Sequence, residues 1–430
     1  MAGSIWFPRP VIRSGPHSIA AAVGALVLLA VAVAACSPGT PSPTTAQTFV
    51  IPPSLALPTS LASATILESE PLATASATLT PVQVSFGQTG GLLVERNTTT
   101  ATLLLDGRVL VAGGYSEGPR GSAWTATAEL YDPGSGSFSP TGPMTTARDG
   151  PAATLLADGQ VLVAGGSTGT AALASAELYD PLTGRFTQTG SMAHARVHAT
   201  ATRLGDGRIL IAGGGASAPE TATAELYDPG SGKFSPTGLM TSGRIGAVAT
   251  SLSDGRVLVV GGTSDTGLPL SSAEIYDPAT GKFSATGSMA YGRRFFAAIS
   301  LLGGRVLVAG GDASMTPGQG VVLSAAELYD PRSGKFSATG FMTVQRRDHA
   351  ATRLGDGRVL ITGGDNASSG AGLRAAEIYD PITGRFSPTS ASMAHPRYGH
   401  TATLLLDGRV LVAAGFGDVQ AGSTAEVCRA

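Results

Sequence analysis

The stretch RVHATATRLGDGRILIAGG at residues 196–214, continued by TAELYDPGSGKFSPTGLM at residues 223–240, decides the fold. Its Asp206-Gly207 pair suits a two-residue hairpin turn, because both residue types tolerate positive φ. The run RILIA after that turn is continuously apolar, as in a strand buried on both faces. AELYD alternates in character, and Asp228-Pro229 predicts a second turn before a short strand. The stretch therefore predicts four antiparallel strands, which we name A to D.

This four-stranded unit recurs along the chain. Its marker is an arginine that precedes strand A, and successive markers are 52, 48, 48, 49, 53 and 51 residues apart. The seven arginines are Arg96, Arg148, Arg196, Arg244, Arg293, Arg346 and Arg397. Four-stranded units in such an array are typical of a β-propeller, in which each unit is one blade. We therefore predict an all-β fold, a seven-bladed β-propeller over residues 82–430.

The repeated marks resemble those of the kelch repeat over residues 84–430. A Gly pair ends strand B in six copies, and Ala414-Gly415 takes its place in the seventh. Tyr-Asp-Pro follows strand C from Tyr131, Tyr179, Tyr227, Tyr276, Tyr329 and Tyr379. The family often has Trp in strand D, where this chain has Phe, a departure that should change packing and not topology. The resemblance implies a kelch-type propeller and is nearly silent on function.

Some kelch propellers carry a copper-radical centre. The galactose oxidases, whose central propeller this chain resembles, need a Tyr cross-linked to a Cys together with Tyr and His ligands. Besides Cys36, this chain has one thiol, Cys428 at its very end. We therefore assign no copper-radical site and expect no metal or other cofactor.

The array has an incomplete unit at each end. The chain ends in STAEVCRA at residues 423–430, which begins like a strand C but has no strand D after it. FGQTGG at residues 86–91 aligns with FSPTGP at residues 138–143, a strand D, yet no strand C precedes it. We expect Glu426 to pair near Phe86. The last blade would then combine the N-terminal outer strand with the C-terminal strands and leave no open sheet edge.

The N-terminus has the features of a lipoprotein signal peptide at residues 1–35. Arg9 and Arg13 precede the apolar run IAAAVGALVLLAVAVAA, and small residues lead to Cys36. The sequence before Cys36 resembles the lipobox of bacterial lipoproteins, in which the Cys is lipidated. Residues 36–81 are rich in Ser, Thr, Pro and Ala and form a linker. We predict a domain outside the cytoplasm, anchored through Cys36; the alternatives are secretion or an uncleaved N-terminal membrane helix.

Composition and charge limit the classes of partner. Of the 430 residues, 59 are Gly, 13% are charged, and the formal net charge is −2. A near-neutral chain lacks the basic surface that nucleic acid requires. If Cys36 is lipidated, Cys428 has no disulfide partner, so we expect it to be a packing residue. We expect a monomer that contacts the membrane only through its anchor.

Repetition separates structural positions from candidate functional ones. A residue present in every unit serves the architecture, so we expect the marker arginines to form ion pairs with a glutamate column in strand C. That column is Glu129, Glu177, Glu225, Glu274, Glu327, Glu377 and Glu426. The alternative is a ring of arginines at the channel mouth that binds anions.

A binding site should instead depart from the repeat, on the face formed by the B–C loops and D–A connections. Mixed aromatic, Arg and His side chains gather in these segments and suit a sugar or a polar peptide. The candidates are Trp124, His198, Tyr291, Arg294, Phe295, Arg347, His349, Tyr398 and His400. Two alternatives stay open: His349 and His400 hydrogen-bond across the channel, or His349, His395 and His400 bind a metal.

The sequence favours binding over catalysis. It has no Gly-x-Ser-x-Gly elbow, no phosphate-binding loop and no paired-carboxylate signature, so we assign no catalytic residue. We predict a binding or scaffold module for a carbohydrate or protein ligand. The alternative is a sugar-acting enzyme, an isomerase, lyase or oxidase-like protein, with its site on the same loop-rich face.

Overall fold

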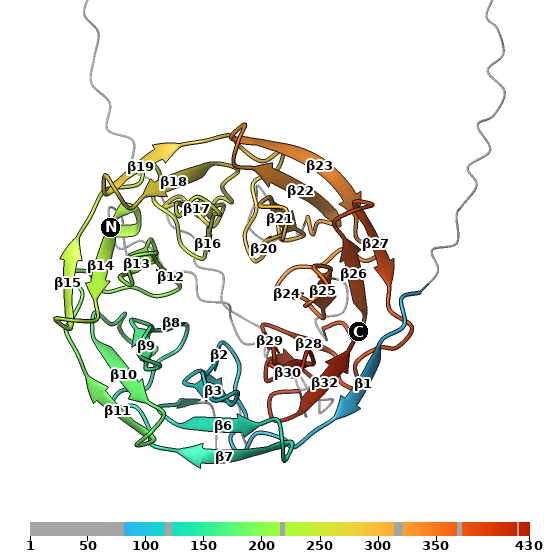
Figure 1. Ribbon diagram of the computed structural model, residues 1–430, viewed down its shortest axis with the longest axis horizontal. Coiled ribbons are helices and arrows are strands. Elements are labelled where there is room, and N and C mark those ends of the chain that lie inside the picture. The colour runs from blue at the N-terminus through green and yellow to red at the C-terminus, as the bar shows by residue number, and fades with distance from the viewer. Residues whose placement is uncertain (1–80, 117–122, 216–219, 314–320, 368–371, 419–420) are drawn as a thin grey trace, which may run out of the picture. The chain divides into compact units, whose positions relative to one another are not determined.

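The computed structural model describes residues 81–430 except 117–122, 216–219, 314–320, 368–371 and 419–420. These residues form seven four-stranded antiparallel sheets arranged as blades in a ring (Figure 1). The predicted signal peptide, Cys36 and nearly all of the linker lie outside the described residues. Within the described part of the chain, no helix has the length and apolar character needed to cross a bilayer.

Each blade consists of strands A to D, ordered from the channel outward. The inner strands A are β2 (Thr100–Leu103), β8 (Ala152–Leu155), β12 (Thr200–Arg203), β16 (Val248–Ser251), β20 (Ala297–Ser300), β24 (Ala350–Arg353) and β29 (Thr401–Leu404). Strands B are β3 (Val109–Ala112), β9 (Val161–Ala164), β13 (Ile209–Ala212), β17 (Val257–Val260), β21 (Val306–Ala309), β25 (Val359–Thr362) and β30 (Val410–Ala413).

Strands C and D complete the blades. Strands C are β6 (Ala128–Asp132), β10 (Ala176–Asp180), β14 (Ala224–Asp228), β18 (Ala273–Asp277), β22 (Ala325–Asp330), β26 (Ala376–Asp380) and β32 (Ala425–Arg429). Strands D are β7 (Ser137–Thr141), β11 (Arg185–Gln188), β15 (Lys233–Pro236), β19 (Lys282–Ala285), β23 (Lys335–Phe341), β27 (Arg385–Pro388) and β1 (Ser85–Gln88). The remaining elements are short: β4 (Tyr115–Ser116), β5 (Ala123–Trp124), η1 (Glu220–Ala222), β28 (Arg397–Tyr398) and β31 (Phe416–Gly417).

The core lies between neighbouring blades. Every residue of the seven strands B is buried, as their continuous apolar runs predict. Between blades 7 and 1, for example, Leu411 and Ala413 pack with Val109 and Val111. Because each such cluster joins two blades, burial of apolar area stabilises the ring as a whole.

Tyrosines of strand C add a polar tie between blades. The hydroxyl group of Tyr227 lies 2.9 Å from Oγ1 of Thr189, which follows strand D of the preceding blade. Its ring also packs against Phe234 of strand D, with 4.8 Å between ring centroids. The same arrangement recurs in blades 1 to 6. Phe in strand D therefore packs within the blade, and the propeller topology is retained, as predicted.

The Gly pair after strand B permits a close approach of the next blade. Gly213 has φ +65°, and a Cβ atom there would lie 2.6 Å from the carbonyl oxygen of Arg244. The N–H group of Gly214 donates to that same oxygen at 2.9 Å. At the closing seam Ala414 adopts φ +64°, and Gly415 donates to the carbonyl of Arg96.

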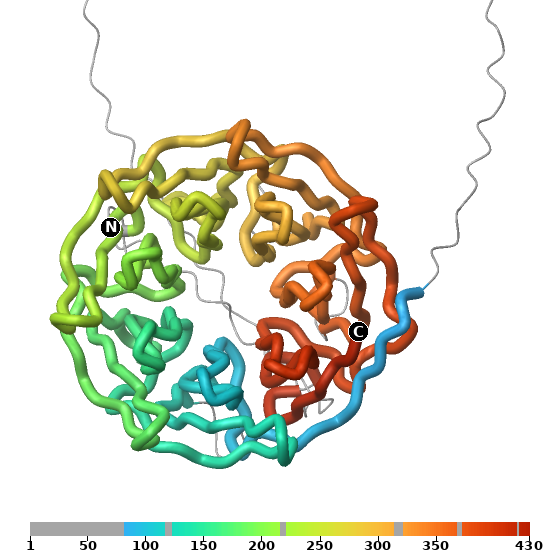
Figure 2. The backbone as a smooth tube through the Cα atoms, in the orientation of Figure 1, coloured from blue at the N-terminus to red at the C-terminus, as the bar shows by residue number. Residues whose placement is uncertain are grey.

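Both ends of the chain build blade 7. Strand β1 pairs with β32 in the register Phe86 with Cys428 and Gln88 with Glu426. Figure 2 shows the blue N-terminal strand lying outside the red C-terminal strand at this seam. The predicted clasp is confirmed, and Cys428 is a buried packing residue. Burial raises the pKa of its thiol to about 12.

The ring has two faces, one at each end of the channel, which we call the turn face and the loop face. The turn face carries the A–B turns, such as Asp206–Arg208, and the C–D turns, such as Asp228–Gly232. The loop face carries the B–C loops and the D–A connections, which contain the seven marker arginines.

Candidate functional site

The marker arginines fix each D–A connection to its blade. In blade 3, Nη1 of Arg196 donates to the carbonyl oxygens of Gly213 and Thr223, and Nη2 donates to Oε1 of Glu225 at 3.0 Å. Oε2 of Glu225 accepts the N–H group of Ala193 at 2.7 Å. All seven arginines make this Arg–Glu pair, at 2.5–3.3 Å. The predicted ion pairs are confirmed, and the anion-binding ring is wrong because every arginine is buried within its blade.

Two residues after each marker arginine, the backbone adopts positive φ around the channel mouth. The values lie between +49° and +62° at Thr98, Gly150, His198, Gly246, Phe295, Asp348 and Gly399. Backbone hydrogen bonds link successive members, such as the N–H group of Asp348 to the carbonyl of Phe295 at 2.8 Å. The architecture thus imposes the left-handed conformation on every blade. Four blades nevertheless place a non-Gly residue there, at a cost of order 1 kcal/mol each. Such strain is a pointer to function.

The loop face is asymmetric around the channel. In every blade except blade 3, the residue after the marker arginine forms a bridge with the residue after the Gly pair or its Ala-Gly equivalent. Blades 2 and 4 have Asp149–Ser167 and Ile245–Thr263 at these positions, whereas blades 5 and 6 have Arg294–Asp312 and Arg347–Asp365.

Blades 5 and 6 carry a ladder of alternating charges, which we call the mouth ladder: Arg294, Asp312, Arg347 and Asp365. Nη2 of Arg294 lies 3.1 Å from Oδ2 of Asp312, and Nη2 of Arg347 lies 2.9 Å from Oδ2 of Asp365. Nη1 of Arg347 also lies 3.3 Å from Oδ2 of Asp312, which joins the two blades. The arginine side chains remain 21% and 27% exposed, while those of Asp312 and Asp365 are 2% and 8% exposed. Buried carboxylates therefore hold two partly exposed guanidinium groups in fixed orientations.

Two residues with positive φ stand beside the mouth ladder. The ring of Phe295 is 46% exposed, and the guanidinium carbon of Arg294 lies 5.6 Å from its centroid. Burial raises the pKa of the Asp348 carboxyl to about 7; Arg347 opposes that shift, whereas Asp365 and Asp312 add to it. An aromatic ring, two guanidinium groups and a carboxyl that titrates near neutral pH thus share one part of the mouth.

Aromatic pairs occupy blades 7 and 1. In blade 7, Tyr398 stacks on Phe416 with 5.2 Å between ring centroids. In blade 1, exposed Trp124 of β5 packs against Tyr115 of β4, with 5.7 Å between ring centroids. Tyr291 is 52% exposed on the D–A connection that enters blade 5.

The candidate histidines have different environments. His198 is exposed, and its ring lies against Gly150 of the preceding blade. His349 and His400 are buried between blades, each with a ring carbon 2.7 Å from where a Cβ atom of Gly310 or Gly363 would be. Nε2 of His400 lies 2.9 Å from Oγ1 of Thr362 in the preceding blade, so the alternative of a hydrogen bond across the channel is wrong for His400.

The structure thus brings Arg294, Phe295 and Arg347 together, with Tyr398 one blade further on. Trp124 lies in blade 1 and His198 in blade 3, away from that group, and His349 and His400 are removed from the exposed surface. Sequence reasoning missed Asp312, Asp365 and Phe416. Their signal was available, because the position after the Gly pair varies from blade to blade while its neighbours repeat.

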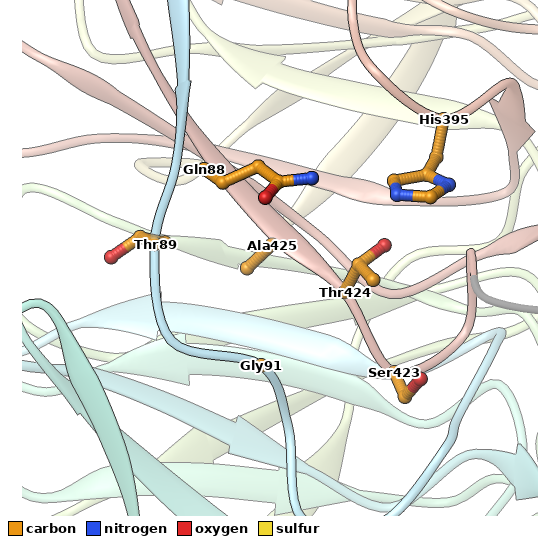
Figure 3. Close-up of a pocket in the computed structure, with 7 residues that line it drawn as sticks. All are labelled: Gln88, Thr89, Gly91, His395, Ser423, Thr424 and Ala425. Carbon is orange, nitrogen blue, oxygen red and sulfur yellow. The ribbon is translucent and has the colours of Figure 1, made fainter.

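A further cavity, of about 350 Å³, opens at the clasp (Figure 3). Its lining comes from both chain ends and from the connection into blade 7: Gln88, Thr89, Gly91, His395, Ser423, Thr424 and Ala425. Nδ1 of His395 lies 3.1 Å from Oδ2 of Asp418. The side chains of Gln88 and His395 face one another across this cavity in Figure 3.

Comparisons with known proteins agree with this geometry. The family model for the Kelch motif matches residues 150–193 and 246–290. The chain therefore contains kelch repeats, and it folds as a seven-bladed β-propeller. No curated protein sequence matches it.

Many solved structures share the fold. One is described as a novel fungal alcohol oxidase with catalytic diversity among the AA5 family, in complex with copper. It superposes with a TM-score of 0.65 at 20% sequence identity, over 80% of this chain and 75% of that chain. At this identity the likeness establishes the fold alone.

The residues that the structure describes do not fit a copper-radical centre. Such a centre needs a thiol at the site, but Cys428 lies buried in the clasp, paired in register with Phe86 and Val410. In the part of the chain that the structure describes, no three His, Cys, Asp or Glu side chains are grouped to hold a metal. His349, His395 and His400, all described residues, therefore do not form such a group.

Proposed function

We propose that the chain is a lipid-anchored binding module outside the cytoplasm, whose channel mouth on blades 5 to 7 binds a carbohydrate. The mouth ladder is the observation that carries the proposal. It breaks the repeat in two adjacent blades, and its guanidinium groups are held by buried carboxylates. A few fixed polar groups beside apolar surface are what a small-molecule site requires.

The chemistry of this site favours a sugar over an ion. Two arginines and two aspartates give the mouth ladder no net charge, so it offers donors and acceptors without strongly attracting ions. The exposed ring of Phe295 offers an apolar face for the C–H groups of a pyranose, and the Tyr398–Phe416 stack offers another. A protein ligand is the alternative occupant.

A glycan array probed with the full-length chain tests the proposal. We expect binding of one glycan class with the glycan recovered unchanged. An absence of binding to every glycan would contradict the carbohydrate proposal and favour a protein ligand.

One observation favours a second candidate, a sugar-acting enzyme. The Asp348 carboxyl, with a pKa of about 7, has the proton affinity that general acid–base catalysis uses. If this candidate is correct, incubation with the bound glycan yields a new product, and Asp348→Asn abolishes product formation but retains binding. Unchanged glycan after prolonged incubation would contradict it.

The anchor has its own test. We expect Cys36→Ser to prevent lipidation and to move the protein from the detergent phase to the aqueous phase on Triton X-114 partitioning. Ser37→Ala is the control and should stay in the detergent phase. Detergent partitioning of the Cys36→Ser protein would contradict the lipid anchor.

A further inference from the structure

The A–B turns carry a repeated Asp–Arg pair on the turn face. In blade 3, Oδ1 of Asp206 accepts the backbone N–H group of Arg208 at 3.0 Å, and Oδ2 accepts from its guanidinium group at 2.6–2.8 Å. Blades 1, 4, 6 and 7 repeat this arrangement. One carboxylate therefore satisfies both the backbone and the side chain of the turn arginine.

Blade 5 keeps the arginine and lacks the carboxylate. Gly303 stands where the other turns have Asp, and within the described residues neither the backbone N–H group nor the guanidinium group of Arg305 has a carboxylate partner. A Cβ atom built on Gly303 meets nothing within 4 Å, and its φ is not in the left-handed region. The fold therefore does not demand glycine here. The place of the missing carboxylate is open.

A cavity of about 310 Å³ adjoins this turn, between blades 5 and 6. Its apolar lining includes Leu302 and Ile382, which are 68% and 94% exposed. The other charged groups that line it are already engaged. Arg358 pairs with Asp356, and the Asp380 carboxylate accepts from the N–H group of Ile382 and the hydroxyl group of Thr383. Arg305 is exposed and has no ion-pair partner within the described residues.

We propose that this site binds an acidic side chain of a partner protein, carried on a segment with apolar neighbours. The partner's carboxylate takes the place of the missing turn aspartate and accepts from the backbone N–H and guanidinium groups of Arg305. The flanking apolar side chains of the partner pack on Leu302 and Ile382. The open place beside the guanidinium group of Arg305 and the exposed apolar pair select this partner, and the site is independent of the channel mouth on the opposite face.

The test uses a fluorescent pentapeptide, blocked at both ends, with a central Asp between two Leu on each side. Fluorescence anisotropy with the full-length chain should show at least tenfold tighter binding of this peptide than of its Asn counterpart. Equal binding of the two peptides, or binding of neither, overturns the proposal.

The variant Gly303→Asp tests whether the peptide binds at the blade 5 turn. This variant restores the pattern of the other turns, so it should fold, melt at a higher temperature and bind the Asp peptide at least tenfold more weakly. Asp206→Gly is the matched control, because it opens the same vacancy beside Arg208 in blade 3, two blades away from the proposed site. It should leave binding at the blade 5 site unchanged. Wild-type affinity in Gly303→Asp overturns the proposal.

Discussion

At the scale of the residue, the marker arginine decides how each blade is held. Arg196 is buried, and its head group bonds two carbonyl oxygens and the carboxylate of Glu225. Taking a guanidinium group out of water is unfavourable unless a partner of opposite charge and further acceptors replace the solvent. The pair thus serves to fix the D–A connection, from which the loop face is built.

Breaking a buried Arg–Glu pair should lower the free energy of unfolding far more than breaking an exposed ion pair. We expect Glu225→Gln to lower the free energy of unfolding by about 3 kcal/mol, because the charge of Arg196 stays buried without its partner. Asp206→Asn, in the exposed pair with Arg208, should change it by less than about 1 kcal/mol. Chemical denaturation measures both values. Similar changes in the two variants would contradict the structural role of the buried pair.

His349 makes the ring sensitive to acid. Burial, with Arg346 and Arg293 nearby, lowers its pKa from 6.5 to about 3. The unfolded chain therefore takes up a proton that the folded chain rejects. Stability linked to His349 is present above pH 6.5 and is lost as the pH falls from 6.5 toward 3.

Replacing this histidine should remove part of that acid sensitivity. Blade 5 has buried Phe296 in the corresponding place, packed on Gly261. We expect His349→Phe to fold and to lose less stability than the wild type between pH 6.5 and pH 4. Thermal unfolding across this range is the measurement, with His194→Phe as the control. Parallel curves for His349→Phe and the wild type would show that the linkage is absent.

At the scale of the element, the clasp between β1 and β32 closes the ring. Four register pairs join β1 to β32, and they cover the outer edge of β32, which would otherwise be unpaired. Leu92, just after β1, then packs into the cluster between blades 7 and 1. Each end therefore contributes to the core and not merely to one sheet.

Removal of either half of the clasp should weaken the whole propeller. We expect deletion of residues 423–430 or of residues 82–91 to lower the melting temperature, because either deletion exposes the apolar clusters on both sides of blade 7. Deletion of residues 60–67 in the linker is a control of similar length and should leave melting unchanged. A clasp deletion that melts like the wild type would refute the closure.

The elements were predictable because the evidence for them recurs in blade after blade. Apolar strands B and Tyr-Asp-Pro segments specify local backbone geometry, and repetition removes the ambiguity of any single copy. The Asp-Gly pairs mark the A–B turns correctly, but the predicted two-residue turn is wrong, because Gly207 has positive φ and Asp206 does not. The channel mouth was less predictable, since Asp312 and Asp365 acquire meaning only when strand register places them opposite Arg294 and Arg347. The burial of His349 and His400 depends on packing against the preceding blade, which no local pattern reports.

At the scale of the whole molecule, a sevenfold architecture carries asymmetric surfaces on both faces. The loop face departs from the repeat at the mouth ladder, and the turn face departs from it at Arg305. The buried strands and the hydrogen bonds between blades make the ring rigid. The mouth ladder and Arg305 are therefore held on a rigid scaffold. Cys428 is free and buried, so no disulfide within the described residues supports that frame.

The most direct test of the account compares glycan binding by two single-residue variants on the array. Phe295→Gly introduces the residue that blades 2, 4 and 7 already have at this position and relieves its positive φ, so the fold should be retained. Leu182→Ala is the control, because Leu182 is 95% exposed on the turn face. We predict that Phe295→Gly binds the glycan at least tenfold more weakly, whereas Leu182→Ala binds it like the wild type. Undiminished binding by Phe295→Gly would contradict the assignment of the channel mouth as the ligand site.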